Sequence, residues 1–245
     1  MRPDAKKKIA TVTPKAGPNP VVIGAIVAVL VVVAVVVAIV IGNGTSGSST
    51  AAGSGVPVGV VGGTGGGIFA NAAQAKPNAP TLDLYEDFQC SNCGHLEQAM
   101  GAQIFSMAKA GQFRLVVHML SFLDTNLGND SSLRAANAAA CAADTGKFLE
   151  YHRAVFAKQP AEGVGYTNAQ LTGFAKTAGI SGSALTTWQK CTTSGQHDQY
   201  VNDVQTAAEK AGVNSTPTLK LNGKDITQTL SSAAAFAVEV KAATS

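Results

Sequence analysis

Residues 82–97 read LDLYEDFQCSNCGHLE, and this stretch decides the fold. Its first four residues alternate between apolar and polar, which is the pattern of a β-strand. A helical pattern opens at His95, and the dithiol CSNC of residues 90–93 lies between the two. We therefore expect the two cysteines at the end of a strand and in the first turn of a helix.

That position favours redox chemistry. The exposed backbone N–H groups and the positive end of the helix dipole stabilise a thiolate there, so the pKa of the first cysteine should be lowered. We expect Cys90 to be the nucleophile and Cys93, one turn further in, to resolve the mixed disulfide. A lower pKa of Cys90 stabilises the reduced protein, which makes its disulfide more oxidising. The pattern predicts an enzyme that exchanges disulfides.

The elements around this stretch predict one α/β domain over residues 68–245. A nearly continuous apolar run at residues 113–120 is typical of a central buried strand. Asn222-Gly223 between two short strands predicts a hairpin with a type I′ turn. The expected order is a short edge strand at 68–70, a strand at 82–85, a helix at about 92–110, a strand at 113–120, helices between 131 and 210, a hairpin at 218–226 and a helix at 230–242.

Residues 21–41 are long and apolar enough to span a membrane. They are Val, Ile, Ala, Leu and one Gly without a charge, and at about 1.5 Å per residue they reach about 31 Å. A cleaved signal peptide has a shorter apolar core, so we expect a retained signal anchor. Residues 1–20 carry five bases against one acid. This basic tail should stay in the cytoplasm, which places the catalytic domain outside.

The segment between the anchor and the domain is rich in glycine. Residues 42–67 contain 11 Gly among 26 residues, a composition typical of a flexible, disordered linker with a span of about 28 Å. Beyond the anchor, 13 of the 18 bases and 14 of the 15 acids remain. The net charge of the outer part is therefore −1, which gives no electrostatic support for binding to nucleic acid.

Three segments together resemble a known family. The stretch at 82–97, the helical insert at about 124–210 and residues 213–224, VNSTPTLKLNGK, are similar to the DsbA-like thiol:disulfide oxidoreductases of the thioredoxin superfamily, in particular membrane-anchored actinobacterial ones. The resemblance implies a thioredoxin-like fold with a helical insertion. It also implies an enzyme that needs no bound cofactor and oxidises cysteine pairs in secreted or cell-envelope proteins. A VKOR- or DsbB-like membrane protein would reoxidise it.

The resemblance also assigns roles to a proline and its neighbour. In this family a cis-proline opens the strand that faces the dithiol, and Pro217 stands at the matching place. Pro217 would lie against Cys90, while the backbone of Thr216 would pair with an extended substrate segment. The alternative is a trans-proline that only starts a strand.

Other residues around the dithiol would tune it. The family commonly has Pro after the first cysteine, whereas this chain has Ser91, and Ser91 and Asn92 together set the stability of the thiolate. Glu86 and Asp87 would raise the pKa of the nucleophile if they approached it. They could also relay a proton to the second cysteine, although we expect solvated loop acids. We expect His95 to be an inert residue on the helix surface.

The two remaining cysteines, Cys141 and Cys191, lie in the helical insert. Four cysteines allow three pairings, and a catalytic C-x-x-C pair leaves these two for each other. We expect a structural disulfide, as relatives of this kind often have. Two buried free thiols are the alternative.

Alternative functions remain at this stage. Cys90, Cys93 and His95 could bind zinc, but a structural zinc site needs four ligands and the sequence offers no second C-x-x-C. We therefore expect no metal. The dithiol could instead serve a reductase or isomerase, or be a static disulfide in a binding module without catalytic activity.

Overall fold

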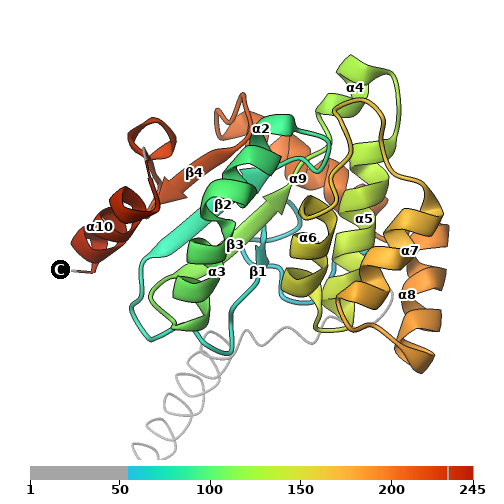
Figure 1. Ribbon diagram of the computed structural model, residues 1–245, viewed down its shortest axis with the longest axis horizontal. Coiled ribbons are helices and arrows are strands. Elements are labelled where there is room, and N and C mark those ends of the chain that lie inside the picture. The colour runs from blue at the N-terminus through green and yellow to red at the C-terminus, as the bar shows by residue number, and fades with distance from the viewer. Residues whose placement is uncertain (1–54, 231, 245) are drawn as a thin grey trace, which may run out of the picture. The chain divides into compact units, whose positions relative to one another are not determined.

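The computed structural model describes residues 55–230 and 232–244 (Figure 1). The predicted basic tail and signal anchor, residues 1–20 and 21–41, lie outside the described residues. Within the described ranges, no helix is both long and apolar enough to cross a bilayer.

Five strands of the described chain form one sheet in the order β1-β3-β2-β4-β5. The two central strands, β2 and β3, run parallel, and every other neighbouring pair is antiparallel. The strands are β1 (Ile68–Phe69), β2 (Thr81–Glu86), β3 (Arg114–Met119), β4 (Thr218–Leu221) and β5 (Lys224–Asp225). The short edge strand, the two long strands and the hairpin expected from the sequence are confirmed.

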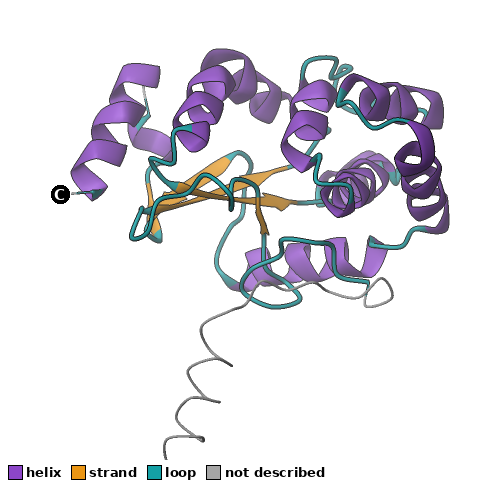
Figure 2. Cartoon of the chain, turned by 90° about the horizontal axis from the view of Figure 1, so that it is seen from below, coloured by secondary structure: helices purple, strands orange, loops and turns teal. Residues whose placement is uncertain are grey.

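Apolar side chains explain why β2 and β3 lie at the centre. Leu82, Leu84, Leu115 and Val117 are each at most 2% exposed, and parallel strands are stable only where both faces are covered. Helices cover both faces of the sheet, as the edge-on view in Figure 2 shows. Burial of the central strands fixes where β2 ends and therefore where the dithiol begins.

The connection from β2 to β3 is helical but not uniform. It consists of α2 (Ser91–Leu96), a single π-helical turn η1 (Glu97–Gly101) and α3 (Ala102–Lys109). The sequence predicts one helix over about the same residues and does not predict the π turn. Such turns are rare and occur frequently at functional sites. Gly111, with φ 67°, reverses the chain after α3, as a glycine at this position readily does.

The hairpin and the last helix follow the expected pattern. Asn222 and Gly223 have φ values of 49° and 79°, as a type I′ turn requires at both central positions. A 3-10 turn, η2 (Thr227–Thr229), and the helix α10 (Ala233–Ala243) complete the described chain.

Six helices of the described chain form the insert, which lies to one side of the sheet in Figure 1. The other five pack around α5, whose alanine-rich surface is almost wholly buried and lets neighbouring helices approach closely. The helices are α4 (Leu123–Leu127), α5 (Ser131–Asp144), α6 (Phe148–Phe156), α7 (Asn168–Thr177), α8 (Gly182–Ser194) and α9 (Asp198–Lys210).

The prediction of a disordered linker over residues 42–67 is wrong from Gly55 onward. Val60 forms a bridge with Ile68, and the hydroxyl of Tyr200 donates to the carbonyl oxygen of Gly66 at 2.9 Å. Glycines here make tight turns rather than a loose coil, because several adopt positive φ and let the backbone pair with itself. Residues 55–67 are therefore part of the folded domain.

Candidate functional site

The dithiol lies where the sequence predicts it. Cys90 is the N-cap of α2, with extended φ and ψ of −69° and 116°, directly beyond the loop that follows β2. Cys93 lies inside the first turn. Neither cysteine is in a disulfide, and Cys90 is 6% exposed whereas Cys93 is 0% exposed. Of the two cysteines, only Cys90 is partly exposed to solvent.

A cis peptide bond joins Thr216 and Pro217, just before β4. The Cys90 thiol donates to the carbonyl oxygen of Thr216 at 3.4 Å. The backbone before β4 therefore touches the first cysteine across a gap of 126 residues in sequence. The predicted roles of Thr216 and Pro217 toward a substrate are taken up below.

The surroundings of Cys90 stabilise its thiolate. The pKa of Cys90 is lowered to about 6, chiefly by a hydrogen bond from the Cys93 thiol, with further support from the backbone N–H groups of Cys93 and Asn92. Desolvation opposes this shift without cancelling it. Hydrogen bonds to the charged form favour that form. At neutral pH the Cys90 sulfur is therefore mostly ionised.

Cys93 has the opposite character. Burial is the main cause that raises the pKa of Cys93 far above its ordinary value, and the hydrogen bond that it donates to Cys90 adds to the effect. A thiol in this position keeps its proton and serves as the donor that Cys90 needs. The two sulfurs thus differ strongly in acidity, although only two residues separate them.

Glu86 and Asp87 are not the solvated loop acids that we expected. Both are 0% exposed, because β2 is a central strand and the insert covers its end. Glu86 Oε2 lies 2.7 Å from Nε2 of His152, on α6. Burial raises the pKa of Glu86 well above its ordinary value and lowers that of His152. No local sequence pattern predicts this pairing.

Asp87 organises the loop that carries the dithiol. Its Oδ1 accepts from the Ser132 hydroxyl at 2.6 Å and from the Gln89 backbone at 2.8 Å. Its Oδ2 accepts from the backbone of Leu123 at 3.3 Å. Burial raises the pKa of Asp87 to about 7. Asp87 therefore connects the insert to the active-site loop, a structural role that the sequence analysis missed.

The insert also holds the backbone on either side of Cys90. The Gln159 side chain donates to the carbonyl oxygens of Phe88 and Cys90 at 2.8 and 2.9 Å. The Tyr166 hydroxyl donates to Phe88 at 2.7 Å. These contacts fix the turn without touching the sulfur atoms.

Ser91 and Asn92, the residues between the cysteines, face outward. The backbone N–H and the hydroxyl of Ser91 both donate to Oε2 of Glu162, at 3.0 and 2.9 Å. A proline at this position could make neither hydrogen bond. The first free N–H of α2 is thus taken by a carboxylate, and the thiolate receives those of Asn92 and Cys93.

We expect Glu162→Gln to lower the pKa of Cys90. The variant removes a negative charge from the helix start, where it disfavours a nearby thiolate. Because Glu162 is exposed, the effect should be only a few tenths of a unit, the range set by exposed ion pairs. Thiolate absorbance at 240 nm measures it, with Glu150→Gln on α6 as an exposed control. A higher pKa in Glu162→Gln would contradict this explanation.

His95 is exposed, as predicted for a residue on the helix surface. Among the described residues, the groups of side chains close enough to share a metal ion do not include Cys90, Cys93 or His95.

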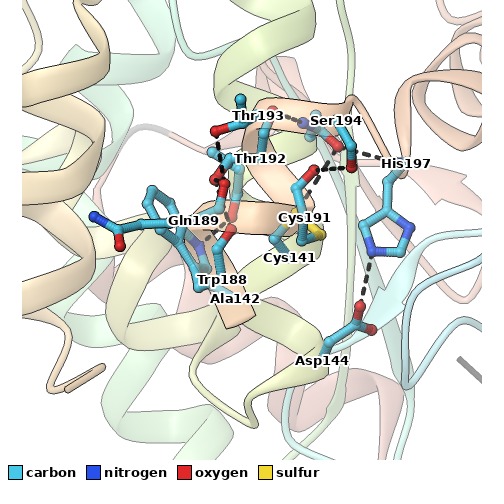
Figure 3. Close-up of a disulfide and its surroundings, with 12 residues drawn as sticks. Cys141, Ala142, Asp144, Trp188, Gln189, Cys191, Thr192, Thr193, Ser194 and His197 are labelled. Atoms are coloured by element: carbon cyan, nitrogen blue, oxygen red, sulfur yellow. Dashed lines mark hydrogen bonds and ion pairs between the residues drawn. A yellow bond between two sulfur atoms is a disulfide. The ribbon is translucent and has the colours of Figure 1, made fainter. Parts of the chain in front are cut away.

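Cys141 and Cys191 form a disulfide that joins α5 to α8 (Figure 3). Nε2 of His197 lies 2.8 Å from Oδ2 of Asp144 beside it. The disulfide lies within the insert and away from the dithiol, so it belongs to the scaffold.

Comparisons with known proteins agree with this geometry. A family model described as Thioredoxin matches residues 71–237. No curated protein sequence matches the chain. Among solved structures, reduced DsbG from Mycobacterium tuberculosis is 30% identical, with 71% of this chain and 85% of that chain covered and a TM-score of 0.59.

Two further solved structures are similar. Reduced DsbA from Mycobacterium tuberculosis is also 30% identical, with 71% of this chain and 89% of that chain covered and a TM-score of 0.59. The thiol-disulfide oxidoreductase MdbA from Actinomyces oris shares the fold at 18% identity, with 77% and 92% covered and a TM-score of 0.63. The chain therefore belongs to the thioredoxin family and is a DsbA-like thiol-disulfide oxidoreductase.

Proposed function

We propose that this protein is a membrane-anchored oxidase that introduces disulfides into secreted and cell-envelope proteins. One observation carries the proposal: the pKa of Cys90 is lowered to about 6 beside a second cysteine that is 0% exposed and keeps its proton. Because its pKa is low, Cys90 is a good leaving group toward the substrate. The buried Cys93 forms and breaks its disulfide with Cys90 inside the protein.

The reaction begins with the Cys90–Cys93 disulfide. A substrate thiolate attacks the Cys90 sulfur, the S–S bond breaks, and Cys93 leaves with the electron pair and takes up a proton. The second substrate thiolate then attacks the substrate sulfur of the mixed disulfide, and Cys90 leaves as a thiolate. The substrate loses two electrons and gains a disulfide, while the enzyme is reduced to its dithiol form.

The pKa of Cys90 sets the direction. Above pH 6 the reduced enzyme holds a stabilised thiolate, whereas the oxidised enzyme has no such group, so each pKa unit below an ordinary thiol favours reduction of the enzyme. A leaving thiolate of low pKa also departs faster. Both effects favour oxidation of the substrate over reduction or isomerisation.

The backbone beside Pro217 supports a place for the substrate. Pro217 directly precedes β4, and the carbonyl oxygen of its neighbour Thr216 lies 3.4 Å from the Cys90 sulfur. An extended peptide that pairs with the backbone of Thr216 would bring its own cysteine to Cys90. In this proposal Thr216 replaces its contact with the thiol by contacts with the substrate.

The proposed location and partners depend on the N-terminal sequence. The uncharged run at residues 21–41 and the five bases before it support a single-pass anchor with the N-terminus in the cytoplasm. The catalytic domain would then lie outside the cytoplasm, and an enzyme that is reduced at each turnover there needs a reoxidant. We propose a VKOR- or DsbB-like membrane protein.

Equilibration with glutathione tests the direction. We expect the reduction potential of the Cys90–Cys93 couple to lie above about −230 mV, on the oxidising side of thioredoxin at about −270 mV. A value at or below that of thioredoxin would favour a reductase. A pair that does not exchange with glutathione would favour a static disulfide in a binding module.

A further inference from the structure

The backbone that contacts Cys90 borders a pocket that the proposed reaction does not use. The pocket has a volume of about 200 Å³ and lies between the end of β3, the last turns of α9 and the loop before Pro217. Ser215 lines it and directly precedes Thr216, whose carbonyl oxygen contacts the Cys90 sulfur. Other lining residues are Leu120, Phe122, Gln205, Glu209 and Val213.

The register of the sheet places this pocket at the dithiol end of the domain. Thr218 on β4 pairs with Tyr85 near the end of β2. The loop from α9 to β4 therefore reaches the end of the sheet where α2 begins (Figure 1). An extended segment advances about 3.3 Å per residue. Side chains within about three residues of a substrate cysteine at Cys90 can therefore reach the pocket.

One wall of the pocket carries a carboxylate that is held in place. Glu209, in the last turn of α9, is exposed, and its Oε1 accepts from Nε2 of Gln205 at 2.8 Å. Gln205 is fixed in turn, because its Oε1 accepts from the backbone of Ser121 at 3.1 Å. No basic side chain of the described residues forms an ion pair with Glu209. Its negative charge is therefore available to a ligand.

The end of α9 adds to the attraction for a cation. The C-terminal end of a helix dipole favours positive charge. At this end the carbonyl oxygen of Ala211 already accepts from the Lys220 ammonium group at 3.3 Å. A second cation near Glu209 would meet the same favourable field.

The remaining walls of the pocket are largely apolar. Leu120 and Val213 are 2% and 6% exposed, and Phe122 is partly exposed. Long basic side chains cover apolar surface with their aliphatic stems while the charged head stays at polar groups. Apolar walls beside one carboxylate therefore match the chemistry of lysine and arginine.

We propose that this pocket binds a lysine or arginine side chain of the substrate, within about three residues of the reacting cysteine. The stem packs on Phe122 and Val213, and the charged head pairs with Glu209. This inference rests on the proposed function and narrows its substrates to segments with a basic residue beside the cysteine. Glu209 determines specificity and takes no part in the exchange of bonds.

Reduced peptides with a single cysteine test the pocket. One set carries Lys at one of the three positions on either side of the cysteine, and two matched sets carry norleucine or Glu there. Oxidised full-length protein in detergent is mixed with excess peptide, quenched with acid and alkylated, and loss of the Cys90–Cys93 disulfide is followed by mass. Each rate is divided by the concentration of peptide thiolate, because a nearby charge also shifts the pKa of the peptide thiol.

At one position or more, the wild type should react faster with the Lys peptide than with the norleucine and Glu peptides. Glu209→Gln keeps an acceptor for Gln205 but removes the charge. It should lower the ratio of the Lys rate to the Glu rate about threefold, within the range of exposed ion pairs, and leave the norleucine rate unchanged. The effect should shrink in about 0.5 M salt. Glu209→Lys should reverse the preference in favour of the Glu peptide.

Glu150→Gln is the matched control, because it removes the same charge from an exposed residue of α6 outside the pocket. It should keep the wild-type ratio. Equal ratios in wild type and Glu209→Gln at every position would overturn the role of the pocket and leave the proposed function standing. An equal loss in Glu150→Gln would assign the preference to the overall charge and also overturn the pocket. A wild-type protein that keeps its disulfide with every peptide would overturn the proposed function itself.

Discussion

Cys90→Ser should reduce the oxidation of a reduced two-cysteine peptide to the uncatalysed rate. The hydroxyl of serine is not ionised at neutral pH and cannot form a disulfide, so neither the resting S–S bond nor the mixed disulfide exists in this variant. The peptide is followed by mass after alkylation, at equal concentrations of variant and wild type.

Two comparisons make the Cys90 result specific. Cys93→Ser keeps the nucleophile but cannot form the Cys90–Cys93 disulfide, so it should not oxidise the reduced peptide. With the oxidised peptide, its Cys90 thiolate should attack the peptide disulfide, release one peptide thiolate and leave a mixed disulfide between Cys90 and the peptide. A variant that lacks Cys141 and Cys191 keeps the dithiol and should oxidise the peptide at a rate close to wild type. Retained oxidation in Cys90→Ser, or a mixed disulfide at Cys93 in preference to Cys90, would contradict the assigned roles.

Removal of the structural disulfide should produce the largest loss of stability. The Cys141–Cys191 bond closes a loop with a sequence separation of 50, and loss of such a bond costs about 2–5 kcal/mol. Chemical denaturation of the double variant Cys141→Ala/Cys191→Ala, compared with wild type, measures the change in the free energy of unfolding. The bond joins α5 to α8, so the lost constraint falls on the insert.

The dithiol provides the control for this experiment. Cys90→Ser lacks only the bond between two residues close in sequence, so its free energy of unfolding should differ much less from that of the wild type. A change below about 0.5 kcal/mol in the double variant would contradict a stabilising role for the Cys141–Cys191 bond.

The part of the site that is local in sequence could be predicted. A strand followed at once by a helix places Cys90 at the helix start, and no distant residue is needed to infer that. The position of Pro217 came instead from the resemblance to a family. Both segments have strong local patterns: one is a strand that ends in a dithiol, and the other is a hairpin after an X-Pro bond. These patterns can be identified without knowledge of distant contacts.

The buried part of the site depends on contacts between distant residues. Glu86 meets His152 across 66 positions, and Ser91 meets Glu162 across 71. An acid three or four residues before a cysteine has the same sequence pattern whether a helix covers it or water does. Packing of the insert over the end of β2 buries Glu86 and Asp87, and the local sequence does not reveal that packing.

The prediction that the folded domain begins at residue 68 is wrong for a related reason. Glycine is common in flexible linkers and also at positions of tight turns that require positive φ. Residues 59, 62 and 63 have φ between 84° and 88°, so glycine there serves turns. Composition does not distinguish the two uses.

The central claim is that Cys90 is ionised at neutral pH in the reduced protein. Absorbance at 240 nm, recorded from pH 3 to 10 for the reduced wild type and for Cys90→Ser, tests it most directly. This account predicts a transition near pH 6 that is missing in Cys90→Ser. A single transition near 8.5, the pKa of an ordinary cysteine, would contradict it.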